Sequence, residues 1–401
     1  MLDVKKIRQD FPIYQANEDL VYLDTAASSL KPKKVIDTVD YYYSNLGVNV
    51  HRGVYGLSYE ATDLYEAARH TVARFLNAKF EEIVFTRGTT SSLNLVASSY
   101  QNKLKSGDEI ITSELEHHSS VLPWMQVSKH TGATLKYVEL DHEGRITVDA
   151  FKKVLSDKTK VVALTYVSNV MGYITPIKEI IDLAHQKGAI VVVDAAQAAP
   201  HLKIDVTALN ADFLAFSGHK ICGPTGIGVL YGKRHLLNSM EPVEFGGDMN
   251  VTVDKFDATW KDAPYRFEAG TPIISGAIGL AKAIDYITEI GFEQIHDHVS
   301  ALHDYAIKQL KEISGIEIYN QSAETGIITF NVTGVHPHDA ASIFDQNKIC
   351  IRAGHHCAQL ITKWLKQIAT LRATFYIYND KSDVDKFIDS VKETVRFFGA
   401  F

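Results

Sequence analysis

The chain has 401 residues, of which 46% are hydrophobic, a composition typical of folded globular proteins rather than of disordered or fibrous ones. Its formal net charge is −7, from 41 lysines and arginines against 48 aspartates and glutamates. Non-specific nucleic-acid binding needs a basic surface, so we expect no nucleic-acid partner and expect a small molecule instead.

The first residues, MLDVKKIRQDFPIY, carry charges throughout and lack the continuous apolar segment of a secretion signal. No later apolar run approaches the roughly 18 residues of a membrane span. The three cysteines, Cys222, Cys350 and Cys357, include no C-x-x-C pair, which argues against a disulfide framework and a cysteine zinc cluster. We therefore expect a cytoplasmic protein with free thiols, no membrane contact and no bound metal.

A helical stripe comes first along the chain, because apolar residues recur at Leu64, Ala68, Val72 and Phe75. From about residue 82 to 230, β-rich runs then alternate with helical segments such as TPIKEIIDLAHQKG. Several runs are apolar at consecutive positions, which suits strands buried on both faces of a parallel sheet. The predicted strands are EEIVFT, DEIITS, TLKYVEL, KVVALTYVS, AIVVVDAA, DFLAFS and GIGVLYG.

The pattern changes after about residue 265. A long helical region, roughly 276 to 313, is followed by strands at GIITFNVTG, ICIRAG and LRATFYIY and by a terminal helix. We predict an α/β fold with two domains. The large domain, 17–265, contains a mainly parallel seven-stranded sheet, and the smaller α+β domain, 266–401, packs against residues 1–16.

Three polar residues follow predicted strands of the large domain: Asn169, Asp194 and Lys220. Ligands of doubly wound sheets bind at such carboxyl ends. A desolvated lysine has a lowered pKa and reacts with carbonyls, although Lys220 could also simply leave a strand end for solvent. Asp194 ends an apolar strand, where a carboxylate needs a cationic partner such as a pyridinium nitrogen.

The stretch FTRGTTSSLNLVA joins a strand, Gly88-Thr89-Thr90 and an apolar-periodic helix. Free amides and hydroxyls at such a helix start bind phosphate, although a plain capped helix has the same pattern. Ser217 and His219, on either side of Gly218, could reach the same phosphate. The glycines around Lys220 match neither the P-loop nor the dinucleotide-binding pattern.

Nine motifs, in order and over nearly the whole chain, resemble those of fold-type I pyridoxal-phosphate enzymes and, more narrowly, of class II (SufS-type) cysteine desulfurases. They are VYLDTAASSLKP, NVHRGVYGLS, TRGTTSSLNLVA, SELEHHSSVLPW, VSNVMG, VDAAQA, FSGHKICGPTGIGVLYG, FEAGTP and RAGHHCAQ. The resemblance implies pyridoxal 5'-phosphate as the cofactor and a homodimer as the assembly.

The resemblance also assigns roles around the cofactor. Lys220 would hold its aldehyde, Asp194 would pair with the pyridinium, Gln197 would bond the phenolic oxygen, and His117 would stack on the ring. His118 points elsewhere and is expected to be structural. The resemblance assigns cofactor binding also to Asn169 and to a set that would contact the phosphate: Thr89, Thr90, Ser217, His219 and, from a second subunit, Thr271.

The substrate carboxylate would be held by Asn169 and Arg372, with Arg352 as a further substrate-binding residue. The planar guanidinium of Arg372 matches a carboxylate through two parallel hydrogen bonds. The alternative for Arg372 is a surface salt bridge. These assignments predict an amino-acid substrate.

Cys357 decides between the reactions that this fold supports. An ordinary thiol, with a pKa near 8.5, is a few per cent thiolate at neutral pH, and His355, His356 and Arg352 are the nearby groups that could lower that pKa. Three consecutive residues cannot all ligate one ion, which disfavours a metal site at His355, His356 and Cys357. Cys222 and Cys350 are interpreted as structural.

The resemblance implies that L-cysteine becomes L-alanine, that Cys357 carries the sulfur as a persulfide, and that an acceptor protein of the SufE or SufU kind takes it for iron-sulfur cluster assembly. The alternatives are a selenocysteine lyase of the same fold, acting on L-selenocysteine, and a non-catalytic sulfur-transfer scaffold. The sequence departs from the family after Cys357, where Leu360 replaces a proline and frees the backbone φ angle.

Overall fold

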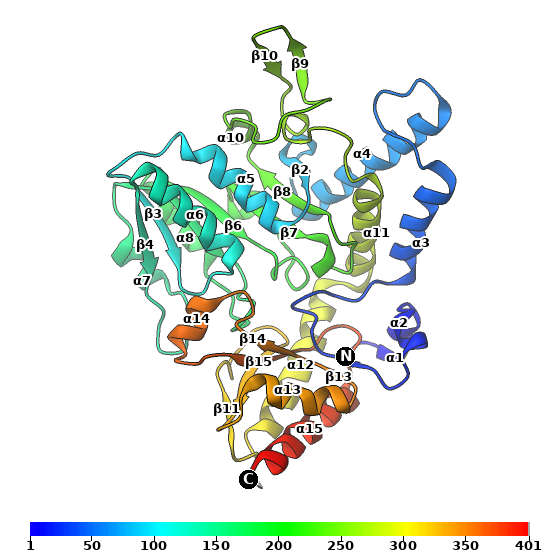
Figure 1. Ribbon diagram of the computed structural model, residues 1–401, viewed down its shortest axis with the longest axis vertical. Coiled ribbons are helices and arrows are strands. Elements are labelled where there is room, and N and C mark those ends of the chain that lie inside the picture. The colour runs from blue at the N-terminus through cyan, green and yellow to red at the C-terminus, as the bar shows by residue number, and fades with distance from the viewer. Residues whose placement is uncertain (400–401) are drawn as a thin grey trace.

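The computed structural model describes residues 1–399. A seven-stranded sheet forms its centre, in the spatial order β2-β8-β7-β6-β5-β3-β4 (Figure 1). All strands run parallel except β8, which is antiparallel to both β7 and β2. The bounds are β2 Ile83–Thr86, β3 Glu109–Ser113, β4 Thr134–Val138, β5 Thr159–Thr165, β6 Ile190–Asp194, β7 Phe213–Ser217 and β8 Gly228–Gly232. The predicted mainly parallel seven-stranded sheet is therefore confirmed.

Helices cover both faces of this sheet, as its continuous apolar strands require. Along β7, Leu214 and Phe216 face one layer of helices, whereas Phe213 and Ala215 face the other. The helices of the large part of the molecule are α3 Lys33–Tyr41, α4 Gly56–Leu76, α5 Thr89–Gln101, α6 His118–Thr131, α7 Val148–Val154, α8 Ile177–Gln186, α9 Val206–Leu209, α10 Arg234–Asn238 and α11 Ile274–Ile290.

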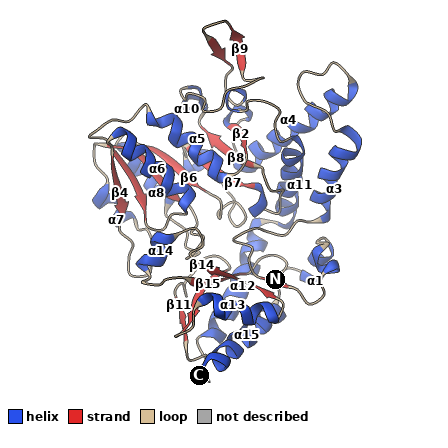
Figure 2. Ribbon diagram, viewed as in Figure 1, coloured by secondary structure: helices blue, strands red, loops and turns tan. Residues whose placement is uncertain are grey.

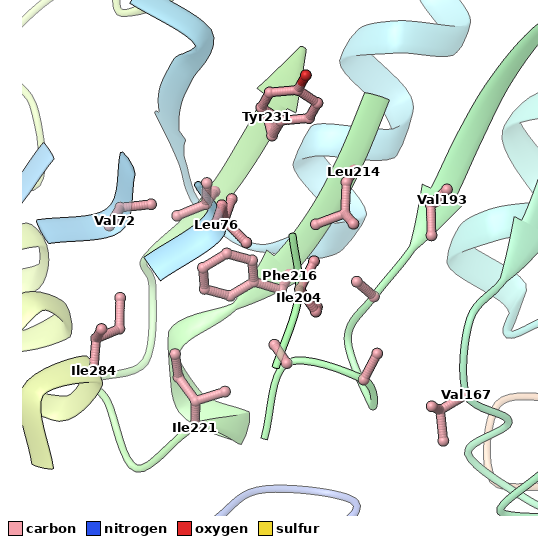
Figure 3. Close-up of a cluster of buried hydrophobic side chains, with 14 of the residues drawn as sticks. Val72, Leu76, Val167, Val193, Ile204, Leu214, Phe216, Ile221, Tyr231 and Ile284 are labelled. Atoms are coloured by element: carbon pink, nitrogen blue, oxygen red, sulfur yellow. The ribbon is translucent and has the colours of Figure 1, made fainter. Parts of the chain in front are cut away.

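The first core layer joins the sheet to α4, α8 and α11. Figure 3 shows Leu214 and Phe216 of β7 beside Leu76 of α4, with Ile284 of α11 on the same side. The second layer packs α5 and α6 on the opposite face, through Val96 and other buried residues. Truncating a fully buried phenylalanine costs about 3–5 kcal/mol, so these two layers fix the position of the strand ends that carry the site.

A second, antiparallel sheet forms the smaller part of the molecule, in the order β11-β12-β15-β14. Its strands are β11 Ile316–Ile318, β12 Ile327–Val332, β15 Thr370–Thr374 and β14 Arg352–Gly354. Helices α12 Phe292–Leu310, α13 Pro337–Gln346 and α15 Lys381–Gly399 pack against it (Figure 2). The predicted α+β character is present here, and α14 Gln359–Trp364 lies between this sheet and the large one.

The N-terminal segment contacts the smaller part of the molecule. It contains α1 Val4–Gln9, α2 Ile13–Ala16 and β1 Val21–Tyr22, which pairs in parallel with β13 Ile349–Cys350. Arg8 donates to the carbonyl oxygen of Tyr378 and pairs with Asp383. The predicted domain limits stay a prediction, and α11, beyond residue 265, packs on α3 and α4.

Three local features differ from the sequence-based expectations. The long helical region is two helices, α11 and α12, separated at Gly291, whose φ of 92° is a left-handed conformation that favours glycine. The strand expected at LRATFYIY ends at Thr374, although residues 375–378 stay buried. A hairpin of β9 Asn250–Val253 and β10 Ala258–Trp260 projects from the top of the molecule in Figure 1. No helix within residues 1–399 is both long and apolar enough to span a bilayer.

Candidate active site

A cavity of about 240 Å³ lies at the carboxyl ends of β5, β6 and β7, where the small sheet meets the large one. It brings together every residue predicted for the site except Thr271. Its walls include Thr89, Thr90, His117, Asn169, Asp194, Gln197, Ser217, His219, Lys220, Arg352, Cys357 and Arg372. Segments separated by up to 346 residues in sequence, from Ala26 to Arg372, therefore meet in one place.

Lys220 ends a single 3-10 turn, Gly218–Lys220, directly after β7. The turn is held because Gly218 donates its N–H to the carbonyl oxygen of Ile227 at 2.9 Å, and Gly223 donates to that of Gly218. Desolvation in the cavity wall lowers the pKa of Lys220 to about 8, against the opposing attraction of Asp194. A substantial fraction of neutral amine, the form that reacts with carbonyls, is therefore present near neutral pH.

Asp194 is the last residue of β6 and is only 4% exposed. One carboxylate oxygen accepts a hydrogen bond from the N–H of Ala196 at 2.9 Å, and within residues 1–399 Asp194 takes part in no ion pair. Burial raises its pKa above the ordinary value. A buried carboxylate that makes no direct ion pair fits a pyridinium nitrogen, which would offset the desolvation of the charge.

The opposite end of the cavity is built by Gly88, Thr89 and Ser217. Thr89 begins α5, and its N–H donates to Ser217 Oγ at 2.8 Å, while the two hydroxyls lie 2.7 Å apart. Gly88 has a φ of 151° and lies against Gly228 of β8, where a Cβ would overlap the Gly88 backbone. The unpaired first-turn amides of α5 and these hydroxyls fit a phosphate group.

His219 and Thr271 complete the predicted phosphate set in different ways. His219 lines the cavity, and burial together with Lys220 lowers its pKa to about 4, so its imidazole is neutral. Thr271 instead lines a wider adjoining cavity of about 690 Å³, whose walls also include Thr89, Thr90, Ser217 and His219. Its reach into the site of a second subunit stays a prediction.

His117 caps the start of α6, where it accepts a hydrogen bond at Nδ1 from the N–H of Ser119 at 3.1 Å. The hydroxyl of Ser119 lies 3.0 Å from the same nitrogen and 2.7 Å from Thr90 Oγ1. Burial first, and then Lys220, lower the pKa of His117 to about 3. A flat, neutral ring with Nδ1 occupied is thus fixed at the cavity wall, which fits stacking on a planar cofactor.

Gln197 is 3% exposed, and its Nε2 donates to the carbonyl oxygen of Ala26 at 2.7 Å. A side-chain amide carries two N–H donors, so one donor stays available for the predicted bond to a phenolic oxygen. Ala26 belongs to the LDTAASS stretch, which therefore forms the wall of the cavity opposite β6.

Arg372 lies in the middle of β15 and is 2% exposed, so the alternative of a surface salt bridge is wrong. Its Nη1 donates to the carbonyl oxygen of Asn169 at 2.8 Å and its Nη2 donates to Asp24 at 3.3 Å. Nε has no partner. Burial lowers the pKa of Arg372 to about 10, against the attraction of Asp24, and the guanidinium stays charged. The unpartnered Nε–H fits a carboxylate of the substrate.

Asn169 holds neighbouring segments of the site in place through its backbone carbonyl oxygen, which accepts from Arg372, and through its side-chain amide N–H. Its Nδ2 donates to the carbonyl oxygen of His356 at 2.8 Å, which ties the end of β5 to the loop of Cys357. Arg352 lines the same cavity from β14, opposite Arg372 across the ladder. Two guanidinium groups on the small sheet therefore face the lysine on the large one.

Cys357 lies exposed on the loop between β14 and α14 and lines the cavity. The prediction that His356 supplies positive charge beside Cys357 is wrong. Burial lowers the pKa of His356 to about 2 and keeps its ring neutral. Cys222 is buried, with a thiol pKa raised to about 12, and Cys350 lies half-buried in β13. The burial of Cys222 and the strand position of Cys350 are compatible with a structural role for both.

Sequence reasoning missed three residues near the cavity. Asp24 pairs with Arg372, and Ser119 holds His117. Glu116, in the segment before α6, is fully buried, accepts from Ser113 Oγ at 2.7 Å, and has a pKa raised to about 8 by burial. Asp24 and Glu116 stand in motifs quoted above, but nothing in their spacing shows their long-range partners.

The chain matches the family model described as Aminotransferase class-V over residues 21–387. It is 51% identical to a "Probable cysteine desulfurase" of Halalkalibacterium halodurans, with 99% of each chain covered. A protein of the same description from Staphylococcus aureus strain Mu50 is 52% identical, over 99% of this chain and 98% of the relative.

Solved structures give the same result. A crystal structure of the cysteine desulfurase CsdA from Escherichia coli has a TM-score of 0.93 and 38% identity, with 99% of each chain covered. An apo structure of a cysteine desulfurase from Thermococcus onnurineus NA1 has a TM-score of 0.95 and 42% identity over the same shares. The resemblance to the fold-type I cysteine desulfurases is thereby confirmed, while the SufS-type subclass stays a prediction. The chain belongs to the aminotransferase class-V family and, within it, to the cysteine desulfurases.

Proposed function

We propose that this chain converts L-cysteine to L-alanine with pyridoxal 5'-phosphate and moves the sulfur to Cys357 as a persulfide, in the manner of the SufS-type enzymes. One observation carries the proposal: the exposed thiol of Cys357 and the partly neutral amine of Lys220 line the same cavity. A non-catalytic scaffold has no need of that combination, nor of a buried carboxylate at Asp194.

The cofactor would be held at three points of this cavity. Asp194 would pair with the ring nitrogen, His117 would cover one face of the ring, and Lys220 would bind the aldehyde. The phosphate would lie at the start of α5 against Thr89 and Ser217. When bound, the cofactor supplies an electron sink for the carbanion that forms on the substrate.

Lys220 and Arg372 would act on different groups of the substrate cysteine. Arg372, with an unpartnered Nε–H in a buried position, would hold the substrate carboxylate and fix the α-carbon beside the lysine. The neutral amine of Lys220 would take the α-proton as general base, since its pKa of about 8 lies near the working pH. The neutral His117 cannot compete with Lys220 for that proton.

The sulfur step falls to Cys357. Its thiolate would attack the sulfur of the bound cysteine, so that an S–S bond forms and the C–S bond breaks. The electron pair of the C–S bond stays on the β-carbon, which takes up a proton. The α-carbon regains the proton that Lys220 removed, and the product leaves as alanine. The persulfide then stands on an exposed loop, which favours delivery to an acceptor protein of the SufE or SufU kind for iron-sulfur cluster assembly.

Cys357→Ser tests this assignment. In that holoenzyme we expect cysteine still to change the visible absorbance of the cofactor, while alanine formation from cysteine stops. Selenocysteine turnover distinguishes the alternative, since selenium can leave without attack by a thiolate. Alanine formation from cysteine at the parental rate would overturn the role of Cys357, and selenocysteine as the only substrate of the parent enzyme would favour a selenocysteine lyase.

We also propose a homodimer in the cytoplasm. The wide cavity next to the phosphate end carries Thr271 and the exposed side chains of Val243 and Ile273, which a second copy would cover. Light scattering of the purified holoenzyme gives the mass directly. Mixing Lys220→Ala subunits with Thr271→Ala subunits tests whether Thr271 reaches into the site of the other subunit. If it does, one site of each mixed dimer has both residues intact and should be active.

A further inference from the structure

Two hydrogen bonds join the start of α6 to the loop that carries Cys357. The backbone N–H of His118 donates to the carbonyl oxygen of Cys357 at 2.7 Å. In the other direction, the backbone N–H of Gln359 donates to Nε2 of the His118 side chain at 3.1 Å. The two residues of the second bond are 241 positions apart, so the bond is a tertiary restraint and no part of local secondary structure.

The loop held by these bonds has an unusual backbone. His356 has a φ of 53° and Cys357 a φ of 55°, so two consecutive residues other than glycine adopt the left-handed conformation. A side chain disfavours that conformation, which persists only where the surroundings hold it. The direction in which Cys357 points therefore depends on contacts made by its neighbours.

The upstream side of the loop has its own restraints. Asn169 donates to the carbonyl oxygen of His356 at 2.8 Å. The ring of His356 is buried, and its Nε2 lies 2.9 Å from Thr370 Oγ1. On the downstream side, α14 begins at Gln359, and its N-cap residue, Ala358, has no side chain able to accept the first free N–H. His118, at the start of α6, supplies that acceptor.

The bond also fixes the chemical state of the imidazole. Because Gln359 donates to Nε2, that nitrogen must be unprotonated, and the ring must be neutral with its proton on Nδ1. Burial first, and then the neighbouring His355, lower the pKa of His118 and favour the neutral ring. His118 thus accepts at Nε2 from a distant segment, whereas His117 accepts at Nδ1 from Ser119 of its own helix.

We propose that His118 is a positioning residue for Cys357: by capping α14 through Gln359, it holds the left-handed loop in the conformation that keeps the thiol on the cavity wall. The proposal rests on the proposed function only in taking Cys357 as the sulfur acceptor. His118 itself need not touch cofactor or substrate, since it is absent from the cavity wall.

Three holoenzyme variants test this role. His118→Ala removes the side-chain acceptor and keeps the backbone bond to Cys357. His118→Gln places an amide oxygen at about the distance of Nε2 and restores an acceptor. His130→Ala, at the exposed end of the same helix, is the matched control.

The first measurement is hydrogen–deuterium exchange of the peptide that contains residues 355–362. We expect exchange at least about tenfold faster in His118→Ala, and near the parental rate in His118→Gln and His130→Ala. The second is a single-turnover assay, in which persulfide formation should slow about tenfold in His118→Ala, while the absorbance change on cysteine binding keeps its amplitude.

Unchanged exchange in His118→Ala would overturn the proposal, and so would faster exchange with parental persulfide formation, because the loop would then not need to be held. Failure of His118→Gln to recover either value would also contradict the acceptor role. Failure of the proposed function is recognised separately, since it would appear as desulfuration by Cys357→Ser, whatever the exchange of the loop.

Discussion

Arg372 Nη1 donates to the carbonyl oxygen of Asn169 at 2.8 Å, across the boundary between the small sheet and the large one. The bond joins β15 to the segment that follows β5. The guanidinium is therefore oriented by the seven-stranded sheet of the same chain as well as by its own strand. Asp24 holds the second nitrogen at 3.3 Å, and the Nε–H stays free. The geometry thus prepares Arg372 for a carboxylate before substrate arrives.

Arg372→Lys should therefore raise the KM for cysteine by about tenfold to a hundredfold, because an ammonium group cannot reproduce the fork that contacts Asn169, Asp24 and a carboxylate together. Steady-state kinetics of the holoenzyme give the value. Arg234→Lys, on the exposed side of α10, is the control and should keep the parental KM. A parental KM in Arg372→Lys would rule out the carboxylate role.

The reaction of the apoprotein with pyridoxal phosphate should follow the ionisation of Lys220. Only the neutral amine reacts with an aldehyde, and burial lowers the pKa of Lys220 to about 8. The rate of adduct formation should rise with pH and level off above about pH 8. Borohydride trapping and peptide mapping measure both rate and location, with the peptide of Lys31 as the internal control. A rise that continues toward pH 10 would contradict the lowered pKa.

Glu116 should make the apoprotein less stable as pH rises. Burial raises its pKa from 4.5 to about 8, so above pH 4.5 the folded chain holds a proton that the unfolded chain has lost. The stabilising contribution is complete below pH 4.5 and is lost as the pH rises through 8, at up to about 1.4 kcal/mol per pH unit.

Glu116→Gln removes this ionisation and should gain stability relative to the parent across the same pH range. Urea unfolding of the apoproteins at several pH values measures the difference in the free energy of unfolding. Glu139→Gln, at an exposed position, serves as the control and should track the parent. A difference between Glu116→Gln and the parent that does not change with pH would show that Glu116 ionises normally.

Gly228→Ala should displace the backbone at the phosphate end of the site, although Gly228 itself does not line the main cavity. A Cβ at Gly228 would overlap the backbone of Gly88, directly before α5, so one of the two segments must shift. Such overpacking costs about 1–3 kcal/mol and would displace the first-turn amides. We expect both a lower free energy of unfolding and weaker binding of pyridoxal phosphate, measured by urea unfolding and cofactor titration. Gly56→Ala, with open space around the added methyl group, should change neither.

Apolar runs and strand ends predicted the larger part of this architecture. All seven strands of the central sheet lie where β-rich runs stand in the sequence, and the polar residues that follow them meet in one cavity. The direction of a strand cannot be predicted in this way, because a buried antiparallel strand such as β8 is as continuously apolar in sequence as its parallel neighbours. The hairpin of β9 and β10, whose strands bury little, has no apolar pattern to detect.

Two residues whose partners the sequence did not reveal act on groups that are distant in the chain. Asp24 acts on Arg372, 348 positions away, and His118 on Gln359, 241 positions away. His356 shows the converse: beside Cys357 in sequence it looks like a cation, but burial against Thr370 leaves it neutral. Local motifs therefore identify the reacting groups better than the groups that orient them.

The three thiols differ sharply in their access to solvent, since Cys222 is buried, Cys350 is half-buried in a strand and Cys357 is exposed. A thiol-directed dye or spin label added to the native chain should for that reason attach first at Cys357, without prior removal of the other cysteines. The molecule thus offers a natural attachment point for a spectroscopic reporter on the loop that contains Cys357.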